Sequence, residues 1–591
     1  NWADWLTGDD KQKMRSYYYW TYMIQASRRL DQPINLPADA YTDDNYAEIV
    51  YSKSAVIFRY MQEYLGEDIM KEIIQTYFNR YKNKHVYPED FWNVAEEVSG
   101  KKLNWMYEDL FSTKKLDYAI LSAGFSETTK DLEVLVKNKG GVNSPIFISS
   151  FLNGNLVYTH TFDGFDGNKI LNLGKIKADE VRIDYHEYMP EINRNNNSYK
   201  IYSIFGGIRP IKFYPITSLD NPKYHDVFIS PLLGYNYHDG FKLGVVLHNA
   251  GVVEKKIRFM STPNYGFGNK TFTGYHKAVY SFYPTDFFDK INVFGVYRNE
   301  TFPAPISNGS NVYENGVIEK YELGTRLNIK NKNAKSTFKS WLTFRYTQTK
   351  IVVPKIVTNT NNYITLTYFG IQKRKYNPYG FELNAQLINA DLLKFFGDAH
   401  YTVHLSKKTK SSIDFRVFGG FFATPTGPLD QQHRLRLSAH NGLGVQSVGN
   451  NNLVISGMTD YLYDDVFLGR YVNDPFNLWS KQISKADGAF RTQIDRAASS
   501  TWLSSFNVTF NSPLKFVSVF ADFGLLGLGN SVVNAYGTGV QVNLIKDIFE
   551  IYFPIYHASG ELLQFSQPTY INYGQQIRFK LDIQRFYNII D

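Results

Sequence analysis

The feature that most constrains this chain is a two-residue alternation of apolar and polar side chains from about residue 203 to the end. Segments of roughly 9 to 13 residues alternate in this way, whereas strands of soluble proteins are usually about 5 or 6 residues long. A strand that crosses a bilayer needs roughly 9 to 11 residues. Aromatic residues tend to lie near the segment ends, as in Tyr235-Asn236-Tyr237, which is typical of the aromatic girdles of membrane barrels.

Five stretches show the alternation best. One face carries Phe241, Leu243, Val245 and Leu247 in the first stretch, Leu342, Phe344 and Tyr346 in the second, Ile413, Phe415 and Val417 in the third, and Val540, Val542 and Leu544 in the fourth. In the last stretch, Ile577, Phe579, Leu581 and Ile583 alternate with Arg578, Lys580 and Asp582. Strands can lie in lipid only when closure satisfies every backbone group.

We therefore predict a transmembrane antiparallel β-barrel of about 14–16 strands over residues 201–591. Residues 422–500 are too long and mixed for a turn, so we expect large loops there with a strand or two inside them. The alternative is a string of soluble β domains, because a soluble sandwich also alternates. Strand length and repetition favour the barrel.

Composition agrees with a membrane barrel. Of 591 residues, 16% are aromatic, none is cysteine, and no stretch of about 18 uncharged apolar residues occurs. This excludes transmembrane helices, disulfides and thiol chemistry. The net charge of +8 is modest for the length and no Lys/Arg-dense run accompanies it, so we expect no nucleic-acid partner.

Residues 1–117 have a helical pattern. Helices are predicted over residues 11–29, from the N-cap Thr42 to Leu65, over residues 67–80, from Pro88 to Ser99, and briefly around Trp105. Residues 118–200 change to short alternating runs separated by Asn/Gly turns, which predicts a small β-sandwich. The polar run of residues 193–197 marks its boundary. The expected organisation is thus multidomain: 1–117 helical, 118–200 sandwich and 201–591 barrel.

No complete catalytic motif is present. The sequence has no His-Glu-x-x-His, Gly-x-Ser-x-Gly, Walker or dinucleotide-binding motif. His186-Glu187 is followed by Tyr188-Met189-Pro190, so the second zinc histidine is missing and a proline interrupts the would-be helix. We interpret His186 as a histidine in a turn.

The helical region nevertheless resembles a known family. In order along the chain it carries Leu30-Asp31-Gln32-Pro33-Ile34, Val50-Tyr51-Ser52-Lys53-Ser54-Ala55, Tyr64-Leu65-Gly66-Glu67-Asp68, Pro88-Glu89-Asp90-Phe91 and Val98-Ser99-Gly100-Lys101-Lys102-Leu103-Asn104-Trp105. This set resembles the region just after the zinc site in membrane alanyl-aminopeptidases, which are gluzincin metallopeptidases. The resemblance covers about residues 20–118 and implies that Tyr51 is catalytic. In that family the tyrosine donates a hydrogen bond to the oxyanion of the tetrahedral intermediate, a role that suits a phenol protonated at neutral pH.

The resemblance also implies zinc as cofactor, although no metal ligand of the family's pattern occurs in these residues. The zinc-binding helix, the glutamate ligand and the loop that binds the substrate amine should all precede this region. We therefore expect that Asn1 is not the natural start and that a zinc-bearing portion precedes it.

The later regions carry resemblances of their own. The predicted sandwich resembles the small domain that follows the helical region in bacterial members of the family. The stretches at residues 464–470, 487–490 and 549–556 resemble surface-antigen-type barrels of the outer-membrane assembly class. Together these resemblances imply a Bacteroidota-like outer membrane.

Three functions follow as hypotheses. The first is an outer-membrane-anchored zinc metallopeptidase-like protein, acting on peptides or proteins, with its helical and sandwich domains in the periplasm. The second is a non-enzymatic barrel subunit of an outer-membrane protein assembly or transport complex, which recruits other outer-membrane machinery. The third is a channel or assembly-factor barrel. In all three, lipid of the bacterial outer membrane surrounds the barrel.

Overall fold

The computed structural model describes residues 14–217, 221, 223–284, 287–305, 313–333, 335–353, 357–406, 411–423, 433–440, 444–445, 455–456, 460–470, 477–492, 494, 497–514, 516–559 and 573–583. They fall into two compact units, each treated by itself below. The first, here the N-terminal unit, contains Asn1–Val227 and Gly251–Lys255. The second, the barrel unit, contains Phe228–Ala250 and Lys256–Asp591.

The N-terminal unit begins with short helices, as the sequence predicts. They are α2 (Met14–Ala26), η1 (Ala38–Ala40), α3 (Asp43–Ala47), η2 (Glu48–Lys53), α4 (Ser54–Leu65), α5 (Glu67–Tyr81), α6 (Pro88–Ser99) and η3 (Trp105–Leu110). The Thr42 hydroxyl accepts a hydrogen bond of 3.3 Å from the backbone N–H of Asn45 at the start of α3. Gly66, with φ +91°, separates α4 from α5. None of the described helices is long and apolar enough to span a membrane.

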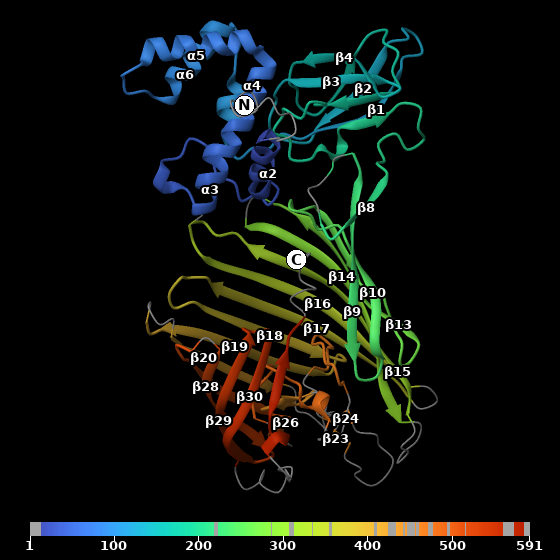
Figure 1. Ribbon diagram of the computed structural model, residues 1–591, viewed down its shortest axis with the longest axis vertical. Helices are drawn as coiled ribbons and strands as arrows, with labels where there is room; N and C mark the ends of the chain where they lie inside the picture. Colours follow the sequence, from blue (N-terminus) through green and yellow to red (C-terminus); the bar gives the residue numbers. More distant parts are fainter. Residues whose placement is uncertain are drawn as a thin grey trace. The chain divides into compact units, whose positions relative to one another are not determined.

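Two antiparallel sheets follow the helices in the N-terminal unit (Figure 1). One has the order β1 (Tyr118–Phe125), β2 (Leu132–Asn138), β5 (Asn168–Asn172), and the other has the order β4 (Asn155–Phe162), β3 (Ile146–Leu152), β6 (Glu180–Ile183), β7 (Ser198–Lys200). Buried side chains of both sheets, such as Val134 and Ile148, share one core cluster with Ile57 and Tyr60 of α4. The helices and the two sheets are therefore held together by a common core. The short strand β8 (Ile211–Pro215) comes next in the chain.

A closed antiparallel barrel begins with β8, runs through its strands in sequence order except for the short strands β21–β26, and closes where β31 neighbours β8. Its other strands are β9 (His225–Asn236), β10 (Gly240–His248), β11 (Ile257–Ser261), β12 (Asn264–Gly266), β13 (Thr271–Phe282), β14 (Phe288–Pro305), β15 (Tyr313–Ile329), β16 (Phe338–Val353), β17 (Val357–Gln372), β18 (Tyr379–Ile388), β19 (Leu392–His404), β20 (Ser412–Phe422), β27 (Trp502–Asn511), β28 (Val517–Leu528), β29 (Ser531–Ile545), β30 (Phe549–Ser559) and β31 (Arg578–Leu581). Both β11 and β12 pair with β10 and with β13, so together they fill one place in the sheet.

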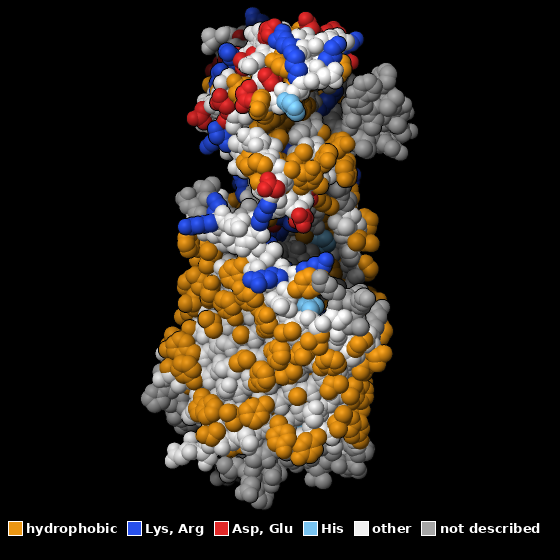
Figure 2. Space-filling model, turned by 90° about the vertical axis from the view of Figure 1, so that its left-hand side faces the viewer, with side chains coloured by type: hydrophobic (Ala, Val, Ile, Leu, Met, Phe, Trp, Pro, Cys, Tyr) orange, Lys and Arg blue, Asp and Glu red, His pale blue; other side chains and the backbone are white. Residues whose placement is uncertain are grey.

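Side-chain polarity around this barrel is the reverse of that in a soluble protein. On β15, Lys320 and Glu322 are buried or nearly so, whereas Tyr321 and Leu323 between them are 42% and 61% exposed. Figure 2 shows hydrophobic side chains gathered over the outer surface of the strands. An apolar exposed face and a polar inner face are expected of a barrel surrounded by lipid.

The alternating stretches predicted from the sequence all lie on barrel strands. They fall on β10, β16, β20, β29 and β31. Strands β14 to β17 have 16 to 18 residues each, which is more than a bilayer crossing requires. The last stretch is shorter than predicted, since β31 has four residues and residues 584–591 lie outside the described part. The number of strands that cross a membrane stays a prediction.

Residues 422–500, where the sequence predicts large loops with a strand or two, lie between β20 and β27 and are described in part; this stretch is called the long loop below. Its described parts contain two-residue strands that pair as β21 (Leu435–Arg436) with β26 (Ala498–Ser499), β22 (Ala439–His440) with β25 (Ile483–Ser484), and β23 (Gly444–Val445) with β24 (Ile455–Ser456). Buried loop residues such as Leu437 and Phe490 form one core cluster with Leu503 of β27 and Leu526 of β28. The loop therefore packs against the barrel wall.

Candidate functional site

Tyr51, the one catalytic residue predicted from the sequence, lies on an irregular turn in the N-terminal unit. The turn η2 is a π-helix, and the backbone N–H of Ser54 closes it by donating to the carbonyl of Ile49, five residues earlier. The Tyr51 side chain is 61% exposed. Its ring meets that of Tyr46 edge to face, with the ring centroids 6.2 Å apart. The phenol is thus within reach of a ligand. The helix predicted from Thr42 to Leu65 is helical in the structure, but Glu48–Lys53 form a π turn within it.

The same turn also carries buried residues. Ser52 and Lys53, which directly follow Tyr51, are 3% and 1% exposed. The Lys53 ammonium donates to the backbone carbonyl of Ser112, with 2.5 Å between Nζ and the oxygen. One short turn therefore presents an exposed phenol and anchors itself by a buried cation.

A buried ion cluster completes this anchor. Lys115 Nζ lies 2.6 and 2.7 Å from the two carboxylate oxygens of Asp31, and Lys53 Nζ lies 3.7 Å from the same carboxylate. The three side chains are at most 3% exposed. Asp31 follows α2 and Lys115 precedes β1, so the cluster joins three separate parts of the chain. We call Asp31, Lys53 and Lys115 the anchor cluster.

Burial perturbs the ionisation of this cluster. It lowers the pKa of Lys53 to about 8, against the opposing effect of the Asp31 charge. It also lowers the pKa of Lys115 from its usual value. Sequence reasoning did not identify the cluster, although Lys53 stands two residues after Tyr51 in the motif and Asp31 belongs to another quoted stretch.

A second buried polar group lies where the helices of the N-terminal unit meet its sheets. Glu191 is fully buried, accepts from the backbone N–H of Tyr118 at 2.8 Å and bonds Asn197. Its own backbone carbonyl accepts from the Tyr19 hydroxyl of α2, at 2.8 Å. Burial raises the pKa of the Glu191 carboxyl well above its usual range. These contacts fix α2 against the sheets and are structural in character.

The described residues do not form a site that fits a zinc ion. Among the described residues, no group of three or more His, Cys, Asp and Glu side chains is arranged to hold a metal. The chain also has no cysteine. The cofactor implied by the resemblance therefore finds no ligand set in the described part of this chain.

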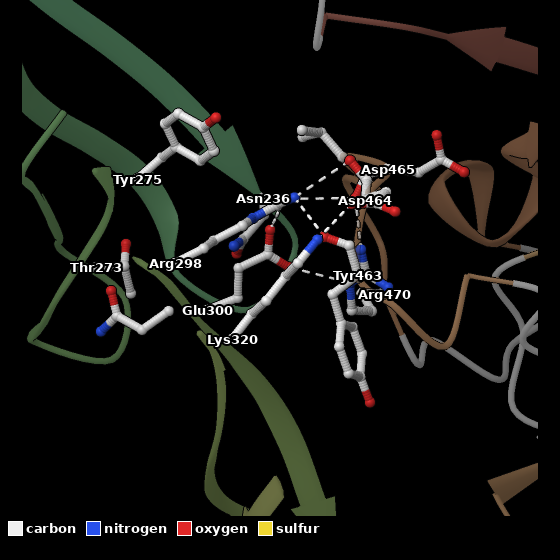
Figure 3. Close-up of polar contacts among 12 residues, drawn as sticks. Asn236, Thr273, Tyr275, Arg298, Glu300, Lys320, Tyr463, Asp464, Asp465 and Arg470 are labelled. Carbon is white, nitrogen blue, oxygen red and sulfur yellow. Dashed lines mark hydrogen bonds and ion pairs between the residues drawn. The ribbon is translucent and has the colours of Figure 1, made fainter. Parts of the chain in front are cut away.

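The barrel unit contains a separate concentration of charge, where the long loop meets the inner face. Arg298 and Glu300 come from β14 and Lys320 from β15, and all three point toward loop residues 460–470 (Figure 3). Arg298 donates to the Tyr463 carbonyl at 2.8 Å, and Arg470 Nε lies 3.0 Å from the Glu300 carboxylate. We call this group the lumen cluster.

Further ion pairs extend the lumen cluster. Asp464 pairs with Lys320 and lies 3.6 Å from Arg345 of β16, and Arg470 also bonds Asp460 at 2.9 Å. A cavity of about 370 Å³ adjoins these charges. Ion pairs with charged loop residues therefore link the neighbouring strands β14, β15 and β16 through the loop.

A second contact fastens the loop farther along the barrel. The Arg491 guanidinium lies 2.5 Å from the carboxylate of Asp522 on β28, and its Nη1 donates to Thr509 of β27 at 2.6 Å. Asn507 of β27 also donates to Asp522, at 3.0 Å. The stretches at residues 464–470 and 487–490 that suggested a barrel family in the sequence lie at or next to these two contacts.

Part of the chain is similar to known proteins. Residues 4–110 match the peptidase family M1 domain. The probable aminopeptidase 2 of Sulfurisphaera tokodaii is 29% identical over 99 residues, which is 17% of this chain and 13% of that protein. Aminopeptidase M1-C of Oryza sativa is 31% identical over 93 residues, 15% of this chain and 10% of that protein. The chain therefore spans only a small part of the length of these curated relatives.

Two solved structures show a partial likeness to the chain. The Legionella pneumophila aminopeptidase A, solved with aspartic acid, aligns over 26% of this chain and 18% of its own, with 20% identity and a TM-score of 0.22. BamA from Haemophilus ducreyi aligns over 61% of this chain and 73% of its own, with 12% identity and a TM-score of 0.32. The strand pairing, rather than these alignments, establishes the barrel.

Proposed function

We propose that this chain is the membrane-anchored part of an M1-type aminopeptidase of a bacterial outer membrane. The observation that carries the proposal is the union of two features in one chain. An M1-like helical segment shares its core with two sheets, and the same chain continues into a closed barrel whose exposed face is apolar. A barrel of this polarity is a membrane anchor by its physical chemistry.

In this proposal Tyr51 donates a hydrogen bond to the oxyanion that forms when the substrate carbonyl is attacked. Its exposure leaves the hydroxyl accessible, and the anchor cluster holds the turn behind it. A fixed donor of this kind stabilises developing charge without reorganising during the reaction. Since the described residues offer no zinc ligands, the zinc that the resemblance implies would need ligands from other residues of the polypeptide.

The order of the chain supports a location. The helices and the two sheets precede β8, the first strand of the closed barrel, and in outer-membrane barrels the short turns lie on the periplasmic side. We therefore propose that the helical and sheet parts are periplasmic, that the substrate is a peptide or protein end reaching that side, and that the host is Bacteroidota-like.

The test uses the complete polypeptide, purified from membranes and returned to lipid. Hydrolysis of an aminoacyl-p-nitroanilide should be lost on treatment with a chelator and should return when zinc is added. Activity that survives complete metal removal, or no hydrolysis of any aminoacyl substrate by the zinc-loaded protein, would contradict the proposal.

The lumen cluster favours a second candidate, a non-enzymatic barrel subunit of an outer-membrane assembly or transport complex. A loop bonded to the inner wall by Asp464, Arg470 and Arg491 would plug the barrel and present its remaining residues to other outer-membrane machinery. Stoichiometric partners that co-purify with the chain and are lost when the loop is shortened would support this function. The absence of hydrolysis by the complete polypeptide would then favour it over the first.

A further inference from the structure

The stretch of chain that leads into the barrel and includes its first strand, β8, has an unusually apolar surface. Within residues 202–216, here the connector segment, seven large apolar side chains are at least 61% exposed, and Ile204 is 95% exposed; they are Tyr202, Ile204, Phe205, Ile208, Ile211, Phe213 and Ile216. Single exposed apolar residues are normal on protein surfaces, but a contiguous group marks a binding surface.

The backbone of the connector segment is held in place, although its side chains are exposed. The backbone N–H of Lys200 donates to the carbonyl of Gly206 at 2.9 Å, and that of His225 donates to the carbonyl of Pro210 at 2.8 Å. The Arg209 guanidinium donates to the Tyr224 carbonyl at 2.5 Å and to the Asn195 side chain at 2.8 Å. The apolar side chains are therefore presented by a fixed backbone.

The charges on this stretch all have one sign. Residues 199–216 contain Lys200, Arg209 and Lys212 and no aspartate or glutamate. Lys212 Nζ lies 5.0 Å and 4.8 Å from the ring centroids of Tyr214 and Tyr224. Aliphatic side chains interleaved with tyrosines and basic residues are the composition of segments that lie at a membrane interface.

A cavity of about 260 Å³ adjoins the connector segment. Its three acidic lining residues are each close to an arginine: Arg182 lies 2.7 Å from Glu180, and Arg194 lies 3.3 Å from Glu187 and 3.7 Å from Asp184. The exposed side chains of Lys200 and Lys223 also line the cavity. The cavity thus has an excess of positive charge beside an apolar surface.

We propose that the connector segment is a membrane-interface anchor. Its apolar side chains insert into the leaflet from which the chain enters the barrel, and Lys200, Lys212 and Lys223 face the phosphates of anionic glycerophospholipids. Continuity supports lipid over a protein partner, because β8 of the connector segment is a strand of the closed barrel and β9 begins nine residues after Ile216, within roughly 30 Å of extended chain. The inference rests on the proposed membrane location of the barrel.

The absence of cysteine from the chain allows a clean test with single cysteines. The full chain with Ile204→Cys, spin-labelled and reconstituted in phosphatidylcholine–phosphatidylglycerol vesicles, is compared with two controls. Leu323→Cys reports the outer face of β15, and Ile170→Cys reports an equally exposed position on β5. Collision rates of each label with oxygen, which enters lipid, and with a nickel chelate, which stays in water, place it in lipid or water.

We expect the labels at Ile204 and Leu323 to collide several-fold more often with oxygen than with nickel, and the label at Ile170 to show the reverse. Lipid contact at Leu323 with water contact at Ile204 would overturn the inference and leave the membrane barrel standing. Water contact at Leu323 would overturn the proposed location and the inference with it. Spin–spin broadening at Ile204 that disappears on dilution with unlabelled protein, without oxygen accessibility, would assign the segment to a second copy instead and overturn the lipid assignment.

A separate measurement tests the proposed contact of the lysines with lipid headgroups. In vesicles of phosphatidylcholine alone, or in a variant with Lys200, Lys212 and Lys223 changed to glutamine, the oxygen-to-nickel ratio at Ile204 should fall at least about twofold. An unchanged ratio in both would overturn the headgroup contact.

Discussion

Removing the charge of Asp31 should loosen the turn that carries Tyr51. The Asp31 carboxylate is the counterion of two ammonium groups that are at most 3% exposed, Lys115 at 2.6 Å and Lys53 at 3.7 Å. Deleting one partner of a buried ion group leaves uncompensated charge and costs about 3–5 kcal/mol. We therefore expect Asp31→Asn to lower the stability of this region by about that amount at pH 7.

The loss should depend on pH in a defined direction. Lys53 already has its pKa lowered to about 8 by burial, and removing the carboxylate that opposes this effect lowers it further. At pH 9 the uncompensated lysine can lose its proton and the penalty shrinks. Asp31→Asn should therefore be more damaging at pH 7 than at pH 9.

Hydrogen exchange of backbone amides in α4, measured on the full chain in lipid, reports the free energy of local opening. Asp39→Asn is the matched control, because Asp39 is an exposed aspartate in the same region. Adding Lys115→Met to Asp31→Asn should restore part of the loss, since it removes one buried charge. A loss of less than about 1 kcal/mol for Asp31→Asn, or a further loss on adding Lys115→Met, would refute the reasoning.

Three further predictions concern both units. The folded pKa of Lys53 (about 8) lies below its unfolded value of 10.5, so the unfolded chain binds the proton more tightly between these pH values and the free energy of unfolding rises with pH there. Lys53→Met should flatten this rise, measured by hydrogen exchange of the α4 amides. An undiminished rise would contradict the prediction. Leu323→Arg places a charge on the outer face of β15 and should lower the free energy of unfolding in vesicles by roughly 2–4 kcal/mol, measured by urea titration. Leu323→Ala should lower it much less. Equal losses would argue against lipid contact. Asp464→Asn should free the loop from Lys320 and Arg345. Because the Asp464 side chain is 41% exposed, we expect a loss of about 1 kcal/mol, which corresponds to roughly a fivefold rise in loop release, visible as increased conductance in planar bilayers. Unchanged conductance would mean that Asp464 does not hold the plug.

Much of the local structure of the N-terminal unit could be predicted because its signals lie close together in the sequence. Thr42 caps a helix, Pro88 begins one and Gly66 separates two, and each of these positions agrees with the structure. The π turn around Tyr51 was not predicted, since one extra residue per turn leaves no trace in three- and four-residue spacing. The anchor cluster was missed because its partners come from distant parts of the chain.

The barrel strands could be predicted from alternation, but the contents of the barrel could not. A period of two separates the faces of a strand and does not say which face meets lipid. The buried pairs of Arg470 with Glu300 and of Arg491 with Asp522 depend on a loop folding back against the wall. The signal available was the density of charged and glycine residues in the stretches at 464–470 and 487–491.

Substitution of Tyr51 tests the central claim most directly. In the complete polypeptide, loaded with zinc and held in lipid, Tyr51→Phe removes one hydroxyl and keeps the ring and its contact with Tyr46. Loss of one oxyanion donor costs roughly 10²–10³ in kcat, so we predict a fall of that size with KM almost unchanged, while Tyr46→Phe retains wild-type rates. A Tyr51→Phe variant that hydrolyses aminoacyl substrates at the wild-type kcat would contradict the account.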